Sequence, residues 1–132
     1  MDGDPSASEH DDVKEGLLIE GLQDWIRLGE IHQEFLFDDD TPKRPVAEAQ
    51  QLTLSMIREL VEEGLFDLGE IVRNTNDGFE AWALSLDDAM AKIEHAYVAN
   101  FDDRWGWTAC AWLQLTEKGR ALALQLYHAE DR

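Results

Sequence analysis

The stretch WLQLTEKGRALALQL, from Trp112 to Leu126, indicates how this chain ends. Apolar residues alternate along 107–115, which predicts a strand with one face toward a core. Thr116 can end that strand and cap a helix over 117–128. Gly119 has no side chain and therefore lets the first turn of the helix pack closely against a neighbour. The stretch predicts a strand that leads directly into a C-terminal helix.

Helical spacing dominates the first half of the chain. Residues 13–28 carry apolar side chains at this spacing, and residues 30–37 form either a short helix or a strand. Residues 46–63 present a single apolar stripe. Pro45 suits the first turn of this helix, and Gly64 suits its end. The best-defined helix therefore lies in the middle of the chain.

A hairpin and another helix are predicted next. Apolar runs at 65–73 and 79–84 flank the pair Asp77–Gly78, which favours a chain reversal. Ser85 then has the side chain of a helix cap, and acidic residues follow it in the first turn. The apolar spacing predicts that this helix extends over 86–99.

Length and composition indicate one domain. The chain has 132 residues, of which 44% are hydrophobic, enough to form a core. Residues 1–11 are acidic and poor in apolar anchors, so we expect a flexible tail followed by a single domain over 12–132. The sequence lacks a run of about 18 apolar residues and an apolar secretory signal. With Cys110 as its only cysteine, the chain is expected in the cytoplasm.

The charge is the most informative bulk property. Asp and Glu number 29 against 11 Lys and Arg, which gives a net charge of -18. Such a field repels phosphate backbones at long range and attracts basic partners. The alternative is that the acidic surface only keeps the protein in solution.

Two stretches resemble parts of winged helix-turn-helix domains. IRELVEEGLFDLG, residues 57–69, resembles the third helix and first wing strand of that family, and residues 112–123 resemble the last strand and following helix of MarR-type and related regulators. The resemblance implies a winged-helix-like α+β fold. It would have a three-helix core, a small antiparallel sheet, an inserted helix in the wing and a C-terminal helix.

The sequence departs from that family where DNA would be read. The helix at 86–99 interrupts the wing. The candidate recognition helix, residues 46–63, contains one basic residue, Arg58, and four glutamates, which gives it a net charge of -3. A reader of DNA needs positive groups to hold the phosphates. The fold resemblance therefore does not carry DNA binding with it.

No motif predicts catalysis or a metal site. The acidic clusters and the four histidines lack the spacing of calcium or zinc ligands. Cys110 lies among small and aromatic residues, which favours a buried, inert thiol. The glycine and serine motifs of hydrolases and nucleotide-binding enzymes are absent from the sequence. We therefore expect no enzyme activity, cofactor or metal.

The leading hypothesis is a module that binds a basic protein partner. Five tryptophans are many for a small domain, and aromatic residues often anchor interfaces. Acidic residues around them would pair with Lys or Arg of the partner. An immunity protein, an antitoxin or a nucleic-acid mimic would fit this description. The predicted partner-binding residues are Asp38, Asp39, Asp40, Asp102, Asp103, Trp105 and Trp112.

Two other classes stay open. A transcriptional regulator, dimeric through its terminal helices, would place Thr53, Ser55, Arg58 and Arg73 toward DNA. A small-molecule-binding domain would need a cavity lined by Trp82 and Trp107. The argument from net charge would fail if five basic residues lay together on one surface without carboxylates among them. These residues are Arg58, Arg73, Arg104, Lys118 and Arg120.

Overall fold

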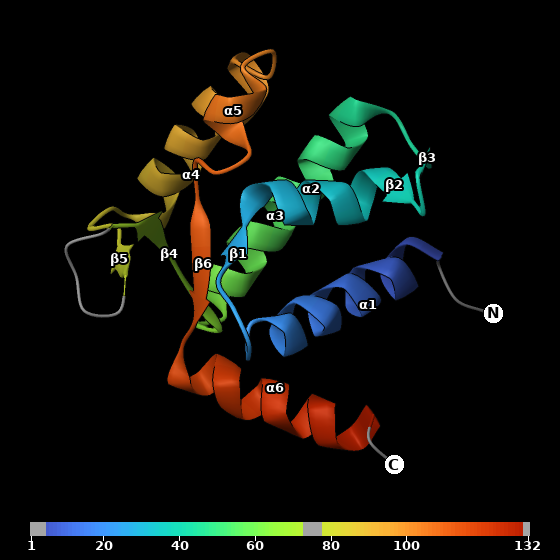
Figure 1. The fold of residues 1–132 in the computed structure, drawn as a ribbon, viewed down its shortest axis with the longest axis vertical. Helices are drawn as coiled ribbons and strands as arrows, with labels where there is room; N and C mark the ends of the chain where they lie inside the picture. Colours follow the sequence, from blue (N-terminus) through green and yellow to red (C-terminus); the bar gives the residue numbers. More distant parts are fainter. Residues whose placement is uncertain (1–4, 73–77, 131–132) are drawn as a thin grey trace.

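The computed structural model describes residues 5–72 and 78–130, and it combines helices with small antiparallel sheets (Figure 1). This mixture confirms the predicted α+β class. Within the described ranges, no helix has the length and apolar character needed to cross a membrane. The elements, in chain order, are α1 (Pro5–Glu20), β1 (Ile26–Arg27), α2 (Leu28–Leu36), β2 (Phe37–Asp38), β3 (Thr41–Pro42), α3 (Val46–Glu62), β4 (Phe66–Ile71), β5 (Phe79–Ala81), α4 (Leu86–Glu94), the π-helical turn η1 (His95–Ala99), α5 (Arg104–Trp107), β6 (Trp112–Leu115) and α6 (Glu117–Glu130).

The larger sheet has the strand order β1-β6-β4-β5, and every neighbouring pair is antiparallel. Leu113 at its centre faces Ile26 on one side and Leu68 on the other, and all three side chains are buried. The β4–β5 pairing confirms the predicted hairpin, although Asp77 lies outside the described residues. A second, two-stranded sheet pairs β2 with β3. It forms at a segment for which the sequence predicted no strand pair.

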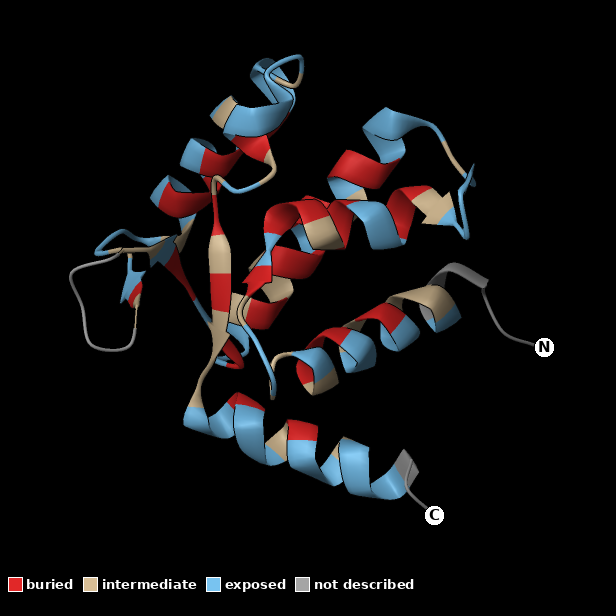
Figure 2. Ribbon diagram, in the orientation of Figure 1, coloured by how far each residue is buried: buried red, intermediate tan, exposed pale blue. Residues whose placement is uncertain are grey.

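The core lies between the larger sheet and the helices α2 and α3. Ile31 and Phe35 on α2 and Ile57 and Leu60 on α3 are almost inaccessible to solvent. Figure 2 shows this buried surface concentrated on the inner faces of the two helices. Burying each such side chain contributes roughly 1.5–3 kcal/mol to folding. Ile93 of α4 extends the core toward the upper part of Figure 1.

The end of α3 meets the end of β6, and the residues that the sequence singled out lie at this junction. Gly64 adopts a φ of 73° and ends α3. The Thr116 hydroxyl donates to the carbonyl of Gly64 at 2.6 Å and accepts from the amide of Gly119 at 3.0 Å. A Cβ on Gly119 would lie 2.0 Å from the carbonyl oxygen of Leu65. Both the predicted cap and the predicted close packing of α6 are confirmed.

The expected tail is in part a helix, because α1 begins at Pro5 and residues 5–11 belong to it. Glu9 forms ion pairs with Lys43 at 2.8 Å and with Arg44 at 2.5 Å. Lys14 contacts Glu59 at 2.6 Å. These partners lie 34 or more residues away along the chain, so the local composition gave no sign of them.

Two predicted boundaries were wrong. The first helix ends at Glu20 instead of reaching residue 28, because Gly21 approaches Leu115 closely and the chain turns there toward β1. The last strand begins only at Trp112, and Trp107 belongs to α5. The alternation along 107–111 therefore came from a short helix and a turn. The predicted helix over 86–99 is confirmed in extent as α4 followed by η1.

Candidate protein-binding site

The segment between β5 and β6 carries the most exposed large apolar side chain in the described part of the chain. This insertion, residues 82–111, contains α4, η1 and α5 and lies at the opposite end of the molecule from α6 (Figure 1). Trp105 on α5 is 89% exposed, against 46% for Leu84. We call residues 100–107 the tip. An indole held in water in this way is a candidate contact for another molecule.

Local hydrogen bonds fix the backbone of the tip. Asp103 caps α5 by accepting from the amide of Gly106 at 3.2 Å. The hydroxyl of Thr108 donates to the carbonyl of Arg104 at 2.9 Å. Asn100 donates from its side-chain amide to the carbonyl of His95 at 2.7 Å, at the end of η1. The tip is therefore an ordered turn with side chains that cap both of its short helices.

An aromatic cluster, to which the tip itself contributes two rings, attaches the tip to the rest of the fold. It consists of His32, Tyr97, Phe101 and Trp107. The rings of Phe101 and Trp107 stack with centroids 4.8 Å apart, and Trp107 donates its indole N–H to the carbonyl of Phe101 at 2.8 Å. Trp107 is only 5% exposed. Two residues along the chain, Trp105 points instead into solvent, so a buried indole anchors the exposed one.

The polar groups of the aromatic cluster are neutral. His32 Nδ1 is hydrogen-bonded to the hydroxyl of Tyr97, and Gln50 donates to the backbone carbonyl of Tyr97 at 3.2 Å. Burial lowers the pKa of His32 and raises the pKa of Tyr97 far above its ordinary value. Nearby, burial also raises the pKa of the Cys110 thiol to about 11. The cluster therefore acts as structural support. This cluster could not be predicted from the sequence, because His32 and Tyr97 are 65 residues apart.

The insertion carries a negative balance. Residues 86–107 hold five acids against two bases, which gives -3. Of the two bases, Lys92 lies 4.3 Å above the ring of Trp82, a cation–π contact. Asp102, Asp103 and Arg104 are exposed and immediately precede Trp105 in the chain. The tip thus combines an apolar anchor with two carboxylates.

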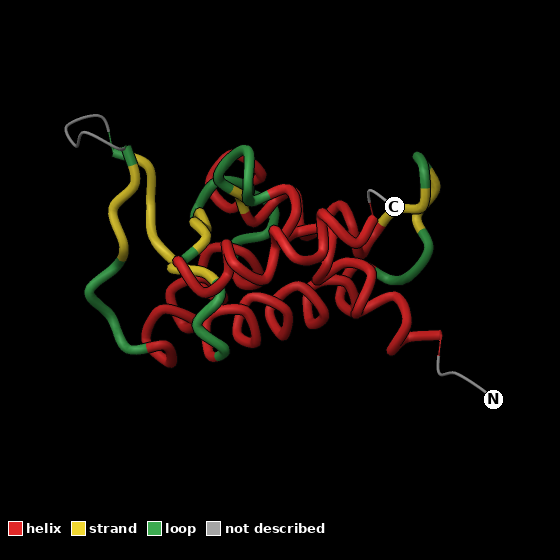
Figure 3. The backbone as a smooth tube through the Cα atoms, turned by 90° about the horizontal axis from the view of Figure 1, so that it is seen from below, coloured by secondary structure: helices red, strands yellow, loops and turns green. Residues whose placement is uncertain are grey.

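The structure brings together only part of the predicted partner-binding set. Asp102, Asp103 and Trp105 lie together at the tip. Asp38, Asp39 and Asp40 are exposed in the β2–β3 hairpin, which lies apart from α5 in two views (Figures 1 and 3). Trp112 lies half-buried in the larger sheet, between Arg27 and Gly69. The seven residues therefore do not form one site.

The residues predicted to face DNA are poorly placed for that role. Thr53 is completely buried, and its hydroxyl donates to the carbonyl of Ala49 at 2.8 Å. Arg58 is paired with Asp87 of α4 at 3.1 Å. Ser55 is exposed, and it shares a shallow surface pocket with Arg58 and three glutamates of the same segment. Arg73 lies outside the described residues.

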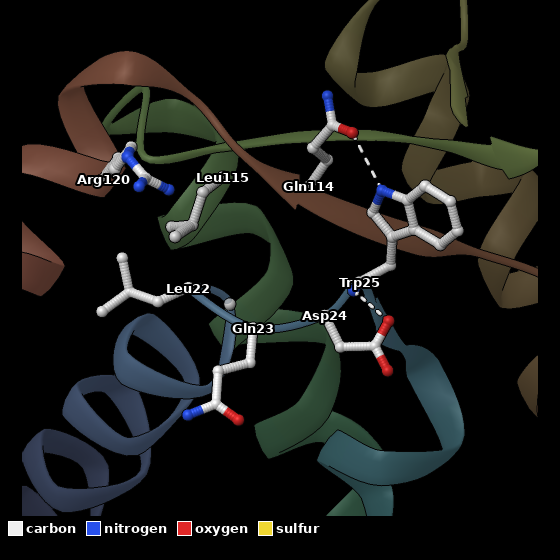
Figure 4. Close-up of a pocket in the computed structure, with 8 residues that line it drawn as sticks. Leu22, Gln23, Asp24, Trp25, Gln114, Leu115 and Arg120 are labelled. Carbon is white, nitrogen blue, oxygen red and sulfur yellow. Dashed lines mark hydrogen bonds between the residues drawn. The ribbon is translucent and has the colours of Figure 1, made fainter. Parts of the chain in front are cut away.

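A groove of about 370 Å³ lies where the turn after α1 meets the end of β6 and the start of α6 (Figure 4). The indole N–H of Trp25 donates to the side-chain oxygen of Gln114 at 2.9 Å. This bond fixes the amide of Gln114, and Arg120 lies at the opposite side of the groove.

The other basic residues lie elsewhere. Lys118 donates to the carbonyl of Glu63 at 2.8 Å. Arg104 is on α5 at the far end of the molecule, so the described bases do not converge on one surface.

The tryptophans expected to line one cavity are also separated. Trp82 lines a cavity of about 190 Å³ together with Leu84 and Leu86. Trp107 does not line it and belongs to the aromatic cluster. The described residues therefore give no support for a shared aromatic ligand pocket.

The chain matches no known protein family, and neither curated proteins nor solved structures provide a match.

Proposed function

We propose that this chain is a winged-helix-like module that binds another protein through its tip. The strand order supports the fold assignment. Strand β6 lies between β1 and β4, and the helices α2 and α3 connect β1 to β4. This order of strands and helices supports the proposal, because the resemblance implies a three-helix core with a small sheet. The insertion then belongs to the wing, where it lies between the strands β5 and β6.

The observation that carries the function is the exposure of Trp105 on a rigid base. An indole buries roughly 200 Å² on association, a gross hydrophobic contribution of about 5 kcal/mol at about 25 cal/mol per Å², from which the costs of association are subtracted. Because Asp103 and Trp107 already hold the tip in place, little conformational freedom is lost when a partner binds. Tryptophan is also the commonest type of interface hot spot. The tip therefore has the properties of an interface anchor.

The charge defines the chemistry of the partner. Asp102 and Asp103 lie two and three residues before the anchor, and the whole chain carries a net charge of -18. A partner with Lys or Arg around an apolar pocket would be attracted at long range and would pair with these carboxylates on contact. An immunity protein, an antitoxin or a nucleic-acid mimic that occupies a basic cleft would work in this way.

An affinity capture from the native cell, read by mass spectrometry, tests the function. The bait is the full chain, compared with Trp105→Ala and with the control Tyr127→Ala. Tyr127 is 45% exposed on α6, far from the tip. We expect wild type and the control to capture the same basic protein. Loss of a hot spot of 2 kcal/mol would weaken its capture by the Trp105 variant roughly 30-fold. Equal capture by all three baits would contradict the role of the tip.

The second candidate is a DNA-binding regulator, which the winged-helix-like order of elements favours. It would dimerise through α1 and α6, where Leu124 and Tyr127 are exposed. Filter binding of mixed genomic DNA at low salt separates the two classes. We expect no retention, because Arg58 is paired with Asp87 and lies among glutamates. Retention that weakens with added salt and is lost in Arg58→Ala would favour the regulator.

A further inference from the structure

Helix α1 is held against the rest of the molecule by an apolar face and by charged groups at both of its ends. It packs alongside α6, and its side chains Val13, Leu17 and Leu18 are buried (Figures 1 and 2). The charged contacts reach α2, α3 and the segment before α3. At one end of the helix two carboxyl groups meet, and at the other end a histidine lies between two carboxylates.

At the C-terminal end of α1, two carboxyl groups face each other. Glu20 of α1 and Glu30 of α2 line the same cavity of about 110 Å³, and Asp12 and Glu34 also line it. Burial, followed by the hydrogen bond and charge of Glu20, raises the pKa of Glu30 to about 7. Arg27 is the one base that opposes this shift, at 3.7 Å from Glu30. At neutral pH the two carboxyl groups therefore favour sharing one proton.

At the N-terminal end, His10 lies between two carboxylates. Its ring contacts Asp11 at 3.2 Å and Glu59 of α3 at 2.8 Å. Burial of the ring opposes protonation, but the two hydrogen bonds outweigh it, so the pKa of His10 is raised. Lys14 also faces Glu59, at 2.6 Å, and contacts Glu63 at 2.8 Å. The protonated imidazole therefore joins a network that links α1 to α3.

Glu30 binds a proton more tightly when α1 is docked than when it is free, and the contact of His10 with Glu59 forms only when α1 is docked. By linkage, proton binding favours the docked helix. We propose that α1 is held on α2 and α3 by protons at His10 and at the Glu20–Glu30 pair, and that it loosens as the pH rises through neutrality. The ion pairs of Glu9 with Lys43 and Arg44 retain their charges, so the helix stays attached at its start. The switch is separate from the tip and does not depend on the proposed partner.

The size of the effect follows from Glu30. With a pKa of about 7 in the docked state and 4.5 in the free state, the undocked fraction would rise up to about 30-fold between about pH 5.5 and about pH 8. The side chains of Glu30 and His10 are each 36% exposed. Solvent screening of such groups reduces the expected rise to roughly three- to tenfold.

Amide hydrogen exchange on the full chain at about pH 5.5 and about pH 8 tests the switch. Each rate is divided by the intrinsic rate at that pH, and the amide of Ile93 in α4 reports on global unfolding. We expect protection of Val13, Leu17 and Leu18 to lie below that of Ile93 at both pH values and to fall roughly three- to tenfold at the higher pH. Glu30→Gln mimics the protonated carboxyl and is expected to remove most of the fall. Glu15→Gln, a change at an exposed acid of the same helix, is expected to behave as wild type.

Three results would overturn the inference. The first is equal protection of α1 at both pH values in the wild-type chain. The second is a Glu30→Gln variant whose protection falls as much as that of wild type. The third is a side-chain carboxyl carbon of Glu30 that titrates near 4.5 by NMR, a measurement that does not depend on any variant.

Discussion

Replacing Gly119 by alanine tests how α6 joins the sheet. The added Cβ would lie 2.0 Å from the carbonyl oxygen of Leu65 and 2.9 Å from a methyl carbon of Leu115. A carbon and a carbonyl oxygen ordinarily approach no closer than about 3.3 Å. The first turn of α6 must therefore move by more than about 1 Å relative to β4. That movement strains the hydrogen bonds from Thr116 to the carbonyls of Leu65, at 3.1 Å, and Gly64, at 2.6 Å.

The expected loss of stability comes from three contributions. Overpacking against a backbone atom costs roughly 1–3 kcal/mol. Weakening of two hydrogen bonds adds about 0.5–1.5 kcal/mol each. The greater helix propensity of alanine returns about 1 kcal/mol. We expect Gly119→Ala to lower the free energy of unfolding by roughly 1–5 kcal/mol.

Gly16 offers the same chemical change without the clash. A Cβ at this position of α1 would meet no atom within 4 Å. Gly16→Ala is therefore expected to stabilise the fold by about 0.5–1 kcal/mol through helix propensity. Urea unfolding followed by tryptophan fluorescence and circular dichroism measures both variants. The packing argument is refuted if Gly119→Ala is as stable as wild type or if both variants shift in the same direction.

Four further outcomes are expected. Tyr97→Phe leaves the buried ring of His32 without its partner and should lower the unfolding free energy by roughly 1–3 kcal/mol in urea titrations; a change below about 0.5 kcal/mol would show that the hydrogen bond contributes little. Cys110, with a pKa of about 11, should react with iodoacetamide at about pH 8 at least about 100-fold more slowly in the folded chain than in urea, and equal rates would contradict its burial. The pKa of Glu30, about 7 in the folded chain, lies above its unfolded value of 4.5, so its stabilising contribution is complete below pH 4.5 and is lost as the pH rises through 7. The unfolding free energy of Glu30→Gln should therefore equal that of wild type at about pH 4 and exceed it by roughly 1–2 kcal/mol at about pH 8, after allowance for solvent screening. A gain that is equal at both pH values would argue against this linkage. Trp105→Ala should change the unfolding free energy by less than about 0.5 kcal/mol, because the indole is exposed, and a larger loss measured by calorimetry would mean that it packs within the fold.

Features that depend on local chemistry could be predicted from the sequence. Ser85 accepts from the amide of Asp88 at 3.1 Å, as its position before an acidic first turn indicated. Gly64 ends α3, and Thr116 caps α6. These residues act through neighbours a few positions away, so their roles are written in short stretches of sequence. The α+β class followed from the same local signals.

Features that depend on distant contacts could not be predicted. Glu9 belongs to a helix because Arg44 and Lys43 bind it from the other side of the fold, not because of its neighbours. The grouping of residues at the candidate site also depends on distant contacts. The sequence singled out Trp105 and its flanking acids, but it also grouped them with Asp38–Asp40 and Trp112, which the fold places elsewhere. The support that His32 gives to the tip depends on a contact across 65 residues.

The way in which the insertion joins the sheet has a consequence for protein engineering. Strands β4 and β6 pair directly along Phe66–Gly69 and Trp112–Leu115, and the insertion lies between β5 and β6 and takes no part in this pairing. Substitutions at the outer surface of the tip therefore leave the register of the central strands intact. A recognition loop from another binding protein could therefore replace the outer part of the tip, while the aromatic cluster and the sheet are kept as the scaffold.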